Sequence, residues 1–165
     1  ERVLRGESQR LIINIPPRHL KSICVSVALP AYVLGLDPTQ RIVCVSYSIE
    51  LAKKHARDCR AVMESAWYKE LFPKTRINPK KNTEVEFETT VRGGRLATSV
   101  SGTLTGRGGN LIIIDDPLRS AADAESETVR EGQIEWYQGT IRTRLEPGGS
   151  IVITAMSPRS STMCA

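Results

Sequence analysis

Aromatic residues and metal-binding side chains are scarce in this 165-residue sequence. Aromatics make up only 5% of it, and it contains four cysteines and two histidines. The cysteines form no C-x-x-C pair and show no zinc-ligand spacing, which argues against a structural zinc site. The core must therefore be built from Ile, Val, Leu and Ala, and the cysteine pattern fits a reducing compartment.

Long hydrophobic runs are absent as well. No charged segment followed by an apolar stretch opens the sequence, so we find no secretory signal. No apolar run approaches the roughly 20 residues that a membrane-spanning helix needs. We therefore expect a soluble, cytoplasmic protein with no membrane partner.

The charge balance is basic. A net charge of +5 and a pI near 9.2 are compatible with a polyanionic partner such as nucleic acid. Charge alone does not establish that partner, because many basic domains bind nothing acidic. The 40% of hydrophobic and 25% of charged residues are typical of a globular protein, and the chain is long enough for one domain with a real core.

Short apolar runs alternate with longer segments of helical periodicity. Strands separated by helices predict an α/β fold with a mainly parallel sheet and helices on both faces. The stretch 72–82, with two prolines and several lysines, is interpreted as an exposed connection. Buried strands are predicted at Arg10–Ile15, Arg41–Ser46 and 111–114, further strands at 84–89, 95–99 and 150–154, and helices at 21–34, 48–66 and 125–145.

The segment 16–22 joins the first predicted strand to the first helix. Lys21 and Ser22 stand where a phosphate-binding loop needs a lysine for the β- and γ-phosphates and a hydroxyl for Mg²⁺. The usual pattern, G-x-x-x-x-G-K-[ST], is only half met, since Ile15 and Leu20 occupy its glycine positions. The alternative interpretation is an ordinary strand–turn–helix with a Lys-Ser cap.

A second motif follows the four aliphatic residues 111–114. There Asp115 and Asp116 come at the end of a predicted buried strand, where one acid can hold Mg²⁺ and the next can orient and deprotonate an attacking water. The alternative is a turn or helix start, for which Asp-Asp-Pro is a good sequence. The two motifs together favour an NTPase, in which ligands collect beyond the carboxyl ends of the strands.

Four segments together resemble the large terminase subunit of tailed phages and prophages. They are P-P-R-H-L-K-S at 16–22, S-Y-S at 46–48, RLATSVSGTLTGRGG at 95–109 and LIIIDDP at 111–117. The resemblance runs from about residue 10 to residue 154. It implies a P-loop NTPase fold with a catalytic strand inserted between the loop strand and its neighbour, and an ATP-driven motor that threads DNA into a capsid.

The resemblance also assigns roles to residues of this sequence. Its nucleotide-binding loop corresponds to Pro17, Arg18, His19, Leu20, Lys21 and Ser22. Its Mg²⁺ ligands correspond to Ser22 and Asp115. Its catalytic residues correspond to Asp116, which takes the water-activating position, and to Arg18, which senses or stabilises the γ-phosphate.

By the same resemblance we expect double-stranded DNA, a portal protein and a small terminase subunit as partners, a homo-oligomeric ring, and a place in the cytoplasm of a bacterial host. The family's nuclease domain and its coupling motif after the last strand are not seen up to residue 165. We therefore interpret 1–165 as a single, incomplete ATPase domain. Two alternatives stay open: a non-catalytic or decayed remnant that binds nucleotide or DNA, and a helicase-like P-loop translocase.

Overall fold

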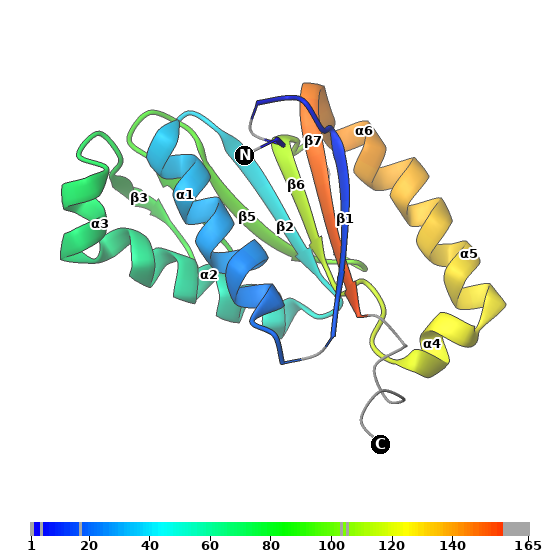
Figure 1. Cartoon of the computed structure of the whole chain (residues 1–165). Helices are drawn as coiled ribbons and strands as arrows, with labels where there is room; N and C mark the ends of the chain where they lie inside the picture. The colour runs from blue at the N-terminus through cyan, green and yellow to red at the C-terminus, as the bar shows by residue number, and fades with distance from the viewer. Residues whose placement is uncertain (1, 4, 17, 103, 105, 157–165) are drawn as a thin grey trace.

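The computed structural model describes residues 2–3, 5–16, 18–102, 104 and 106–156 (Figure 1). Its strands are β1 Arg10–Ile15, β2 Arg41–Ser46, β3 Ile77–Asn82, β4 Glu86–Thr89, β5 Gly94–Ser99, β6 Gly109–Asp115 and β7 Leu145–Met156. They join in one sheet in the order β1-β7-β6-β2-β5-β4-β3. Neighbours from β1 to β5 are parallel, whereas β4 and β3 are antiparallel additions at one edge.

Helices lie in the connections from β1 to β2, from β2 to β3 and from β6 to β7. Two of the segments, η1 and η2, are π-helical turns that continue directly into α-helices. The helical elements are η1 Ile23–Ala28, α1 Leu29–Leu36, α2 Ile49–Glu64, α3 Ala66–Leu71, α4 Ala121–Glu125, α5 Glu127–Trp136, η2 Tyr137–Ile141 and α6 Arg142–Arg144. The predicted α/β class with a mainly parallel sheet is therefore confirmed.

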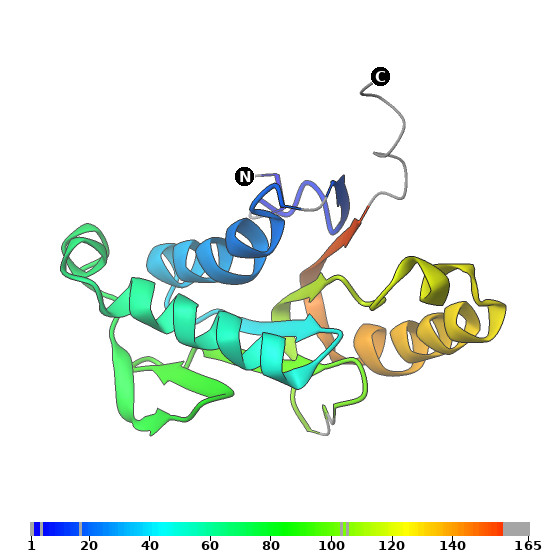
Figure 2. The ribbon, with the colours of Figure 1, turned by 90° about the horizontal axis from the view of Figure 1, so that it is seen from below.

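Helices pack on both faces of the sheet. Side chains alternate in direction along each strand, so each strand presents residues to both faces. In β2, Ile42 and Cys44 pack with η1 and α1, whereas Val43 and Val45 pack with Ile141 of η2. Figures 1 and 2 show α1 and α2 on one side of the sheet and α5 and α6 on the other. Strand β6 is buried on both faces, as its run of aliphatic residues predicts.

Strand β1 departs from the prediction of a buried strand. Its residues alternate between exposed and partly exposed, and Ile12 is 66% exposed. The reason is position: β1 stands at the edge of the sheet and pairs only with β7. An apolar run gives no information about whether a strand is central or at an edge.

The segment 72–82 is not only a connection. Its second half, Ile77–Asn82, forms β3, which pairs with β4 at the other edge of the sheet. Its last four residues are exposed, and edge strands accept proline and lysine because one side of the backbone pairs with nothing. The composition that suggested a loop is therefore equally compatible with an edge strand.

The segment 21–34, predicted as the first helix, contains Pro30. A π-helical turn precedes Pro30, which takes one of the first positions of α1, and the helix then runs on to Leu36. Widening the turn before a proline accommodates the ring and the missing N–H. None of the described helices has the length and apolar character to cross a membrane.

Helix α2 matches its prediction closely. The Ser48 side chain accepts a hydrogen bond from the Leu51 N–H at 3.3 Å and so caps the helix. The buried residues of this helix are Ala52, His55, Ala56, Cys59 and Met63, and His55 is 4% exposed. This helix carries His55 toward the end of β6, where the candidate site lies.

Candidate functional site

The loop after β1 and the acids after β6 lie at the same edge of the sheet (Figure 1). The register shows why, since Asp115 of β6 pairs with Thr154 of β7, which in turn pairs with Ile13 of β1. The strand inserted between the loop strand β1 and the acid strand β6 is therefore β7. Polar side chains from three parallel strand ends meet at this edge, which is where α/β proteins bind ligands.

The loop between β1 and η1 has an unusual backbone. Arg18 and Leu20 have φ angles of 65° and 57°, in the left-handed region that favours glycine. Leu20 stands at a glycine position of the usual phosphate-loop pattern, so the backbone turns there without the glycine. The conformation costs a non-glycine residue roughly 1–2 kcal/mol.

Asp116 shares this feature, with a φ of 45°. Arg18, Leu20 and Asp116 are thus three of the four non-glycine residues with positive φ in the described part of the chain, and the fourth is Arg92. Strained backbone of this kind collects at functional sites. The concentration at one sheet edge singles out this place.

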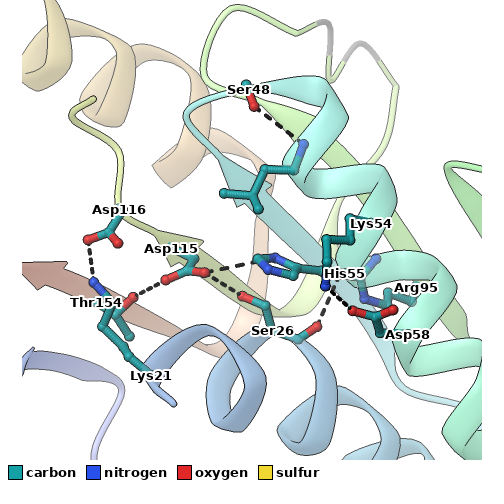
Figure 3. Close-up of polar contacts among 11 residues, drawn as sticks. Lys21, Ser26, Ser48, Lys54, His55, Asp58, Arg95, Asp115, Asp116 and Thr154 are labelled. Carbon is teal, nitrogen blue, oxygen red and sulfur yellow. Dashed lines mark hydrogen bonds and ion pairs between the residues drawn. The ribbon is translucent and has the colours of Figure 1, made fainter. Parts of the chain in front are cut away.

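Lys21 and Asp116 are in direct contact. The Lys21 Nζ donates to Asp116 Oδ1, and the lysine side chain is only 6% exposed against 21% for the aspartate (Figure 3). A buried ammonium needs such a partner, because desolvation otherwise costs several kcal/mol. The structure therefore brings together the loop lysine and the second of the two acids.

Asp115 is held differently. It is fully buried, with Oδ1 accepting from the Thr154 hydroxyl at 2.6 Å and Oδ2 accepting from the Ser26 hydroxyl at 3.2 Å (Figure 3). His55 Nδ1 lies 3.9 Å from Oδ2. Burial lowers the pKa of His55 despite the opposing charge of Asp115, so the ring is neutral at pH 7.

Ser26 and Thr154 were not among the predicted site residues. Ser26 follows Ser22 by four residues, one helical turn, and a polar residue at that spacing on an otherwise apolar helix face is a detectable signal. Thr154 is a hydroxyl at the end of an apolar strand, the same pattern that drew attention to Asp115. Both signals become meaningful only when the strand order is known.

A hollow of about 290 Å³ opens over the loop. Asp115 does not line it, and His19 is exposed outside it with Nδ1 3.2 Å from the Pro16 carbonyl oxygen. Pro17 lies outside the described residues. The lining consists of Pro16, Arg18, Leu20, Lys21, Ser22, Ile23 and Asp116.

A larger hollow, of about 430 Å³, lies at the opposite end of the strands, between α1 and the start of β7. It is lined by Leu36, Asp37 and Asn110 among others, and none of the residues of the two motifs reaches it. The volume of a hollow therefore does not identify the site. The positive φ angles of Arg18 and Leu20 and the contact between Lys21 and Asp116 identify it.

The oxygen donors of the site can coordinate Mg²⁺ only together with phosphate oxygens. No cluster of three or more His, Cys, Asp or Glu able to hold a metal is found among the described residues. Ser22 and Asp116 line the hollow, whereas Asp115 is fully buried and does not line it. Mg²⁺ in nucleotide sites takes one or two carboxylates plus phosphate and water oxygens, so this donor set fits a Mg²⁺–nucleotide complex.

Solved structures with the same fold are phage large terminases. The HK97 bacteriophage large terminase gives a TM-score of 0.59 at 16% identity, covering 90% of this chain and 29% of that chain. The large terminase ATPase domain of Thermus phage P74-26 gives 0.58 at 14% identity, covering 94% and 64%. A mutant of that domain gives 0.62 at 14% identity, covering 99% and 67%.

At these identities the likeness establishes the fold. The chain has the fold of the large terminase ATPase domains and spans 29% of the length of the HK97 terminase. No protein-family model matches the sequence, and no curated protein does. The structural likeness supports the resemblance drawn from the motifs.

Proposed function

We propose that this chain is the ATPase part of a DNA-packaging motor and hydrolyses ATP with Mg²⁺ at the hollow over the β1–η1 loop. The observation that carries the proposal is the contact between Lys21 and Asp116, made across a left-handed loop at the carboxyl edge of the sheet. A nearly buried lysine beside an open hollow is what a phosphate group needs from a protein. The shared fold adds support.

The roles of the loop residues follow from their chemistry. Pro16 and Pro17 have no N–H, so the backbone donors for phosphate oxygens are those of residues 18–22, next to the positive end of the helix dipole. Lys21 would bind the β- and γ-phosphates, and Arg18, which is exposed at the rim, would reach the γ-phosphate. His19 and Leu20 contribute through the backbone that they shape.

Ser22 and Asp115 would hold Mg²⁺, Asp115 directly or through water. The ion supplies neutralisation of the charge that develops on the phosphate oxygens. Asp116 would orient and deprotonate the attacking water. Phosphoryl transfer asks little more of the protein than positioning and charge, which this arrangement provides.

The Lys21–Asp116 pair implies that nucleotide binding comes before activation of the base. While the two side chains are paired, the Oδ1 of Asp116 is occupied by the lysine. A nucleotide phosphate competes for Lys21, and the carboxylate released from the lysine becomes available as a base. ATP binding would thus activate the base at the same site.

The same contact favours a second candidate, a non-catalytic domain that binds nucleotide without turnover. If the pair persists when nucleotide is bound, Asp116 stays occupied and no base remains. Aspartate is also one methylene shorter than the glutamate common at this position, which increases the distance to the water. Steady-state phosphate release separates the candidates, because a remnant would bind ATP and release none.

The wider role is part of the proposal. Duplex DNA would be the translocated substrate, consistent with the net charge of +5. The chain would act as one ATPase domain within a homo-oligomeric ring, with a portal protein and a small terminase subunit as partners, in the cytoplasm of a bacterial host.

The direct experiment compares Lys21→Ala with Lys81→Ala. Lys81 pairs with Glu88 between β3 and β4, away from the hollow, and is an exposed ion-paired lysine. The wild type and Lys81→Ala should bind MgATP and release phosphate, whereas Lys21→Ala should do neither. Equal ATP affinity of Lys21→Ala and the wild type, measured by calorimetry, would refute the nucleotide site.

A further inference from the structure

In a regular α-helix the Ser26 carbonyl would have no backbone donor. In an α-helix the carbonyl of residue 26 accepts from the N–H of residue 30, and residue 30 is proline, which has none. The π-helical turn Ile23–Ala28 lies at this point. A side chain from another element takes the carbonyl instead: Arg95 of β5 donates from Nη2 to the Ser26 oxygen at 3.1 Å (Figure 3).

Arg95 is an unusual residue to find there. It is 1% exposed, and its Nε and Nη1 are buried with no hydrogen-bond partner among the described residues. A buried guanidinium with two unsatisfied donors is costly, so its presence in the sheet calls for an explanation. The hydrogen bond from its Nη2 leads to Ser26.

The hydrogen bonds continue from Ser26 to the site. The hydroxyl of the same residue donates to Asp115 Oδ2 at 3.2 Å, so Ser26 links the arginine of β5 to the acid of β6. Arg95 and Asp115 also act on one shared neighbour. Burial is the main cause of the lowered pKa of His55, the Asp115 charge opposes it and the Arg95 charge adds to it.

We propose that Arg95 is a positioning residue of the site. It holds the Ser26 carbonyl in place of the donor that Pro30 lacks, and so keeps the Ser26 hydroxyl against Asp115 and sets the direction of that carboxylate. The inference rests on the proposed ATPase function, in which Asp115 holds Mg²⁺. Arg95 itself touches neither the hollow nor the loop.

A matched control is a second buried side chain that donates to a carbonyl of the same helix. Tyr68 is 1% exposed, and its hydroxyl donates to the Ala31 carbonyl at 2.7 Å, one helical turn beyond Ser26. Tyr68→Phe removes a buried hydrogen bond to a carbonyl of this helix that leads to no acid. It should lower the unfolding midpoint and leave kcat unchanged.

The test combines Arg95→Met with Pro30→Ala. Arg95→Met should lower kcat for ATP hydrolysis by about 10- to 100-fold, the cost of a misplaced catalytic group, while KM for ATP stays within its error. Pro30→Ala supplies the missing N–H. Added to Arg95→Met, it should restore most of the lost kcat and raise the thermal unfolding midpoint more than it does in the wild type.

A second pair of variants covers the case in which Arg95→Met does not fold. Ser26→Ala keeps the carbonyl and removes only the hydroxyl, so it should fold and show the same loss in kcat. In a folded double variant, adding Arg95→Met to Ser26→Ala should lower kcat no further. An Arg95→Met enzyme with wild-type kcat, or a Ser26→Ala enzyme with wild-type kcat, would overturn the proposal.

The unfolding measurements separate this inference from the proposed function. If the wild type releases no phosphate, the ATPase assignment fails, and the thermal midpoints of the wild type and the three Arg95 and Pro30 variants still test the hydrogen-bond substitution. An equal effect of Pro30→Ala in both backgrounds would show that Arg95 does not replace the proline's donor.

Discussion

The Nζ of Lys21 contacts the Oδ1 of Asp116 across 95 residues of sequence, at the carboxyl edge of the sheet. The contact joins the two motifs that the sequence presents separately. The contact also keeps the charge of Asp116 paired with that of Lys21 until another anion binds the lysine. Four predictions test what this arrangement does.

The Asp116→Asn variant should bind ATP at least as tightly as the wild type and hydrolyse it far more slowly. The amide cannot act as a base, and Lys21 no longer has an anionic partner to leave. Because a nearly buried ammonium loses its counter-charge, the free energy of unfolding should fall by about 1–3 kcal/mol. Calorimetry, phosphate release and urea unfolding measure the three effects. Undiminished phosphate release would show that Asp116 is not the base.

Leu20→Gly tests the left-handed loop. Glycine removes a conformational cost of roughly 1–2 kcal/mol, and Leu20 is 64% exposed, so little burial is lost. The variant should therefore be as stable as the wild type or slightly more so. Ile134→Gly is the control, since Ile134 is 55% exposed inside α5 and should lose about 1 kcal/mol. An equal loss in both variants would mean that the loop is not strained.

Thr154→Val tests the second hydroxyl on Asp115. The substitution keeps the shape and removes the donor at 2.6 Å, leaving a buried carboxylate oxygen with one partner fewer, so stability should fall by about 1–3 kcal/mol. Hydrolysis should need a higher Mg²⁺ concentration. Thr75→Val, which removes a buried hydrogen bond to the Leu34 carbonyl, should cost stability without changing the Mg²⁺ requirement. A Mg²⁺ titration of phosphate release decides the point.

The nature of the DNA substrate separates a packaging motor from a helicase-like translocase. Duplex DNA should stimulate ATP hydrolysis more than single-stranded DNA of the same length. The stimulation should weaken as salt is raised, since phosphate contacts release counterions. Stronger stimulation by the single strand would favour the translocase.

Much of the fold can be predicted from local sequence patterns. The aliphatic runs at 42–45 and 111–114 are strands because a strand buried on both faces needs apolar residues at every position. Ser48 begins α2 because a hydroxyl can accept from a backbone N–H of the first turn. These properties belong to a few neighbouring residues, so a linear sequence displays them.

Other features depend on partners far away in the chain. The edge position of β1 follows from the strand order, and the same apolar run would suit a central strand. Ser26 and Thr154 reach Asp115 only because η1 and β7 are placed beside β6. The patterns of η1 and β7 each predict an element and say nothing about which acid the hydroxyl will meet.

The sequence by itself determined the class of the fold, most of its strands, and the two motifs of the candidate site. Tertiary structure decided that Lys21 pairs with Asp116, that Asp115 accepts from the hydroxyls of Ser26 and Thr154, and that Arg95 donates to the Ser26 carbonyl. The physical reason is range: backbone preference and periodicity act over a few residues, whereas these contacts are made by strands brought together from distant parts of the chain.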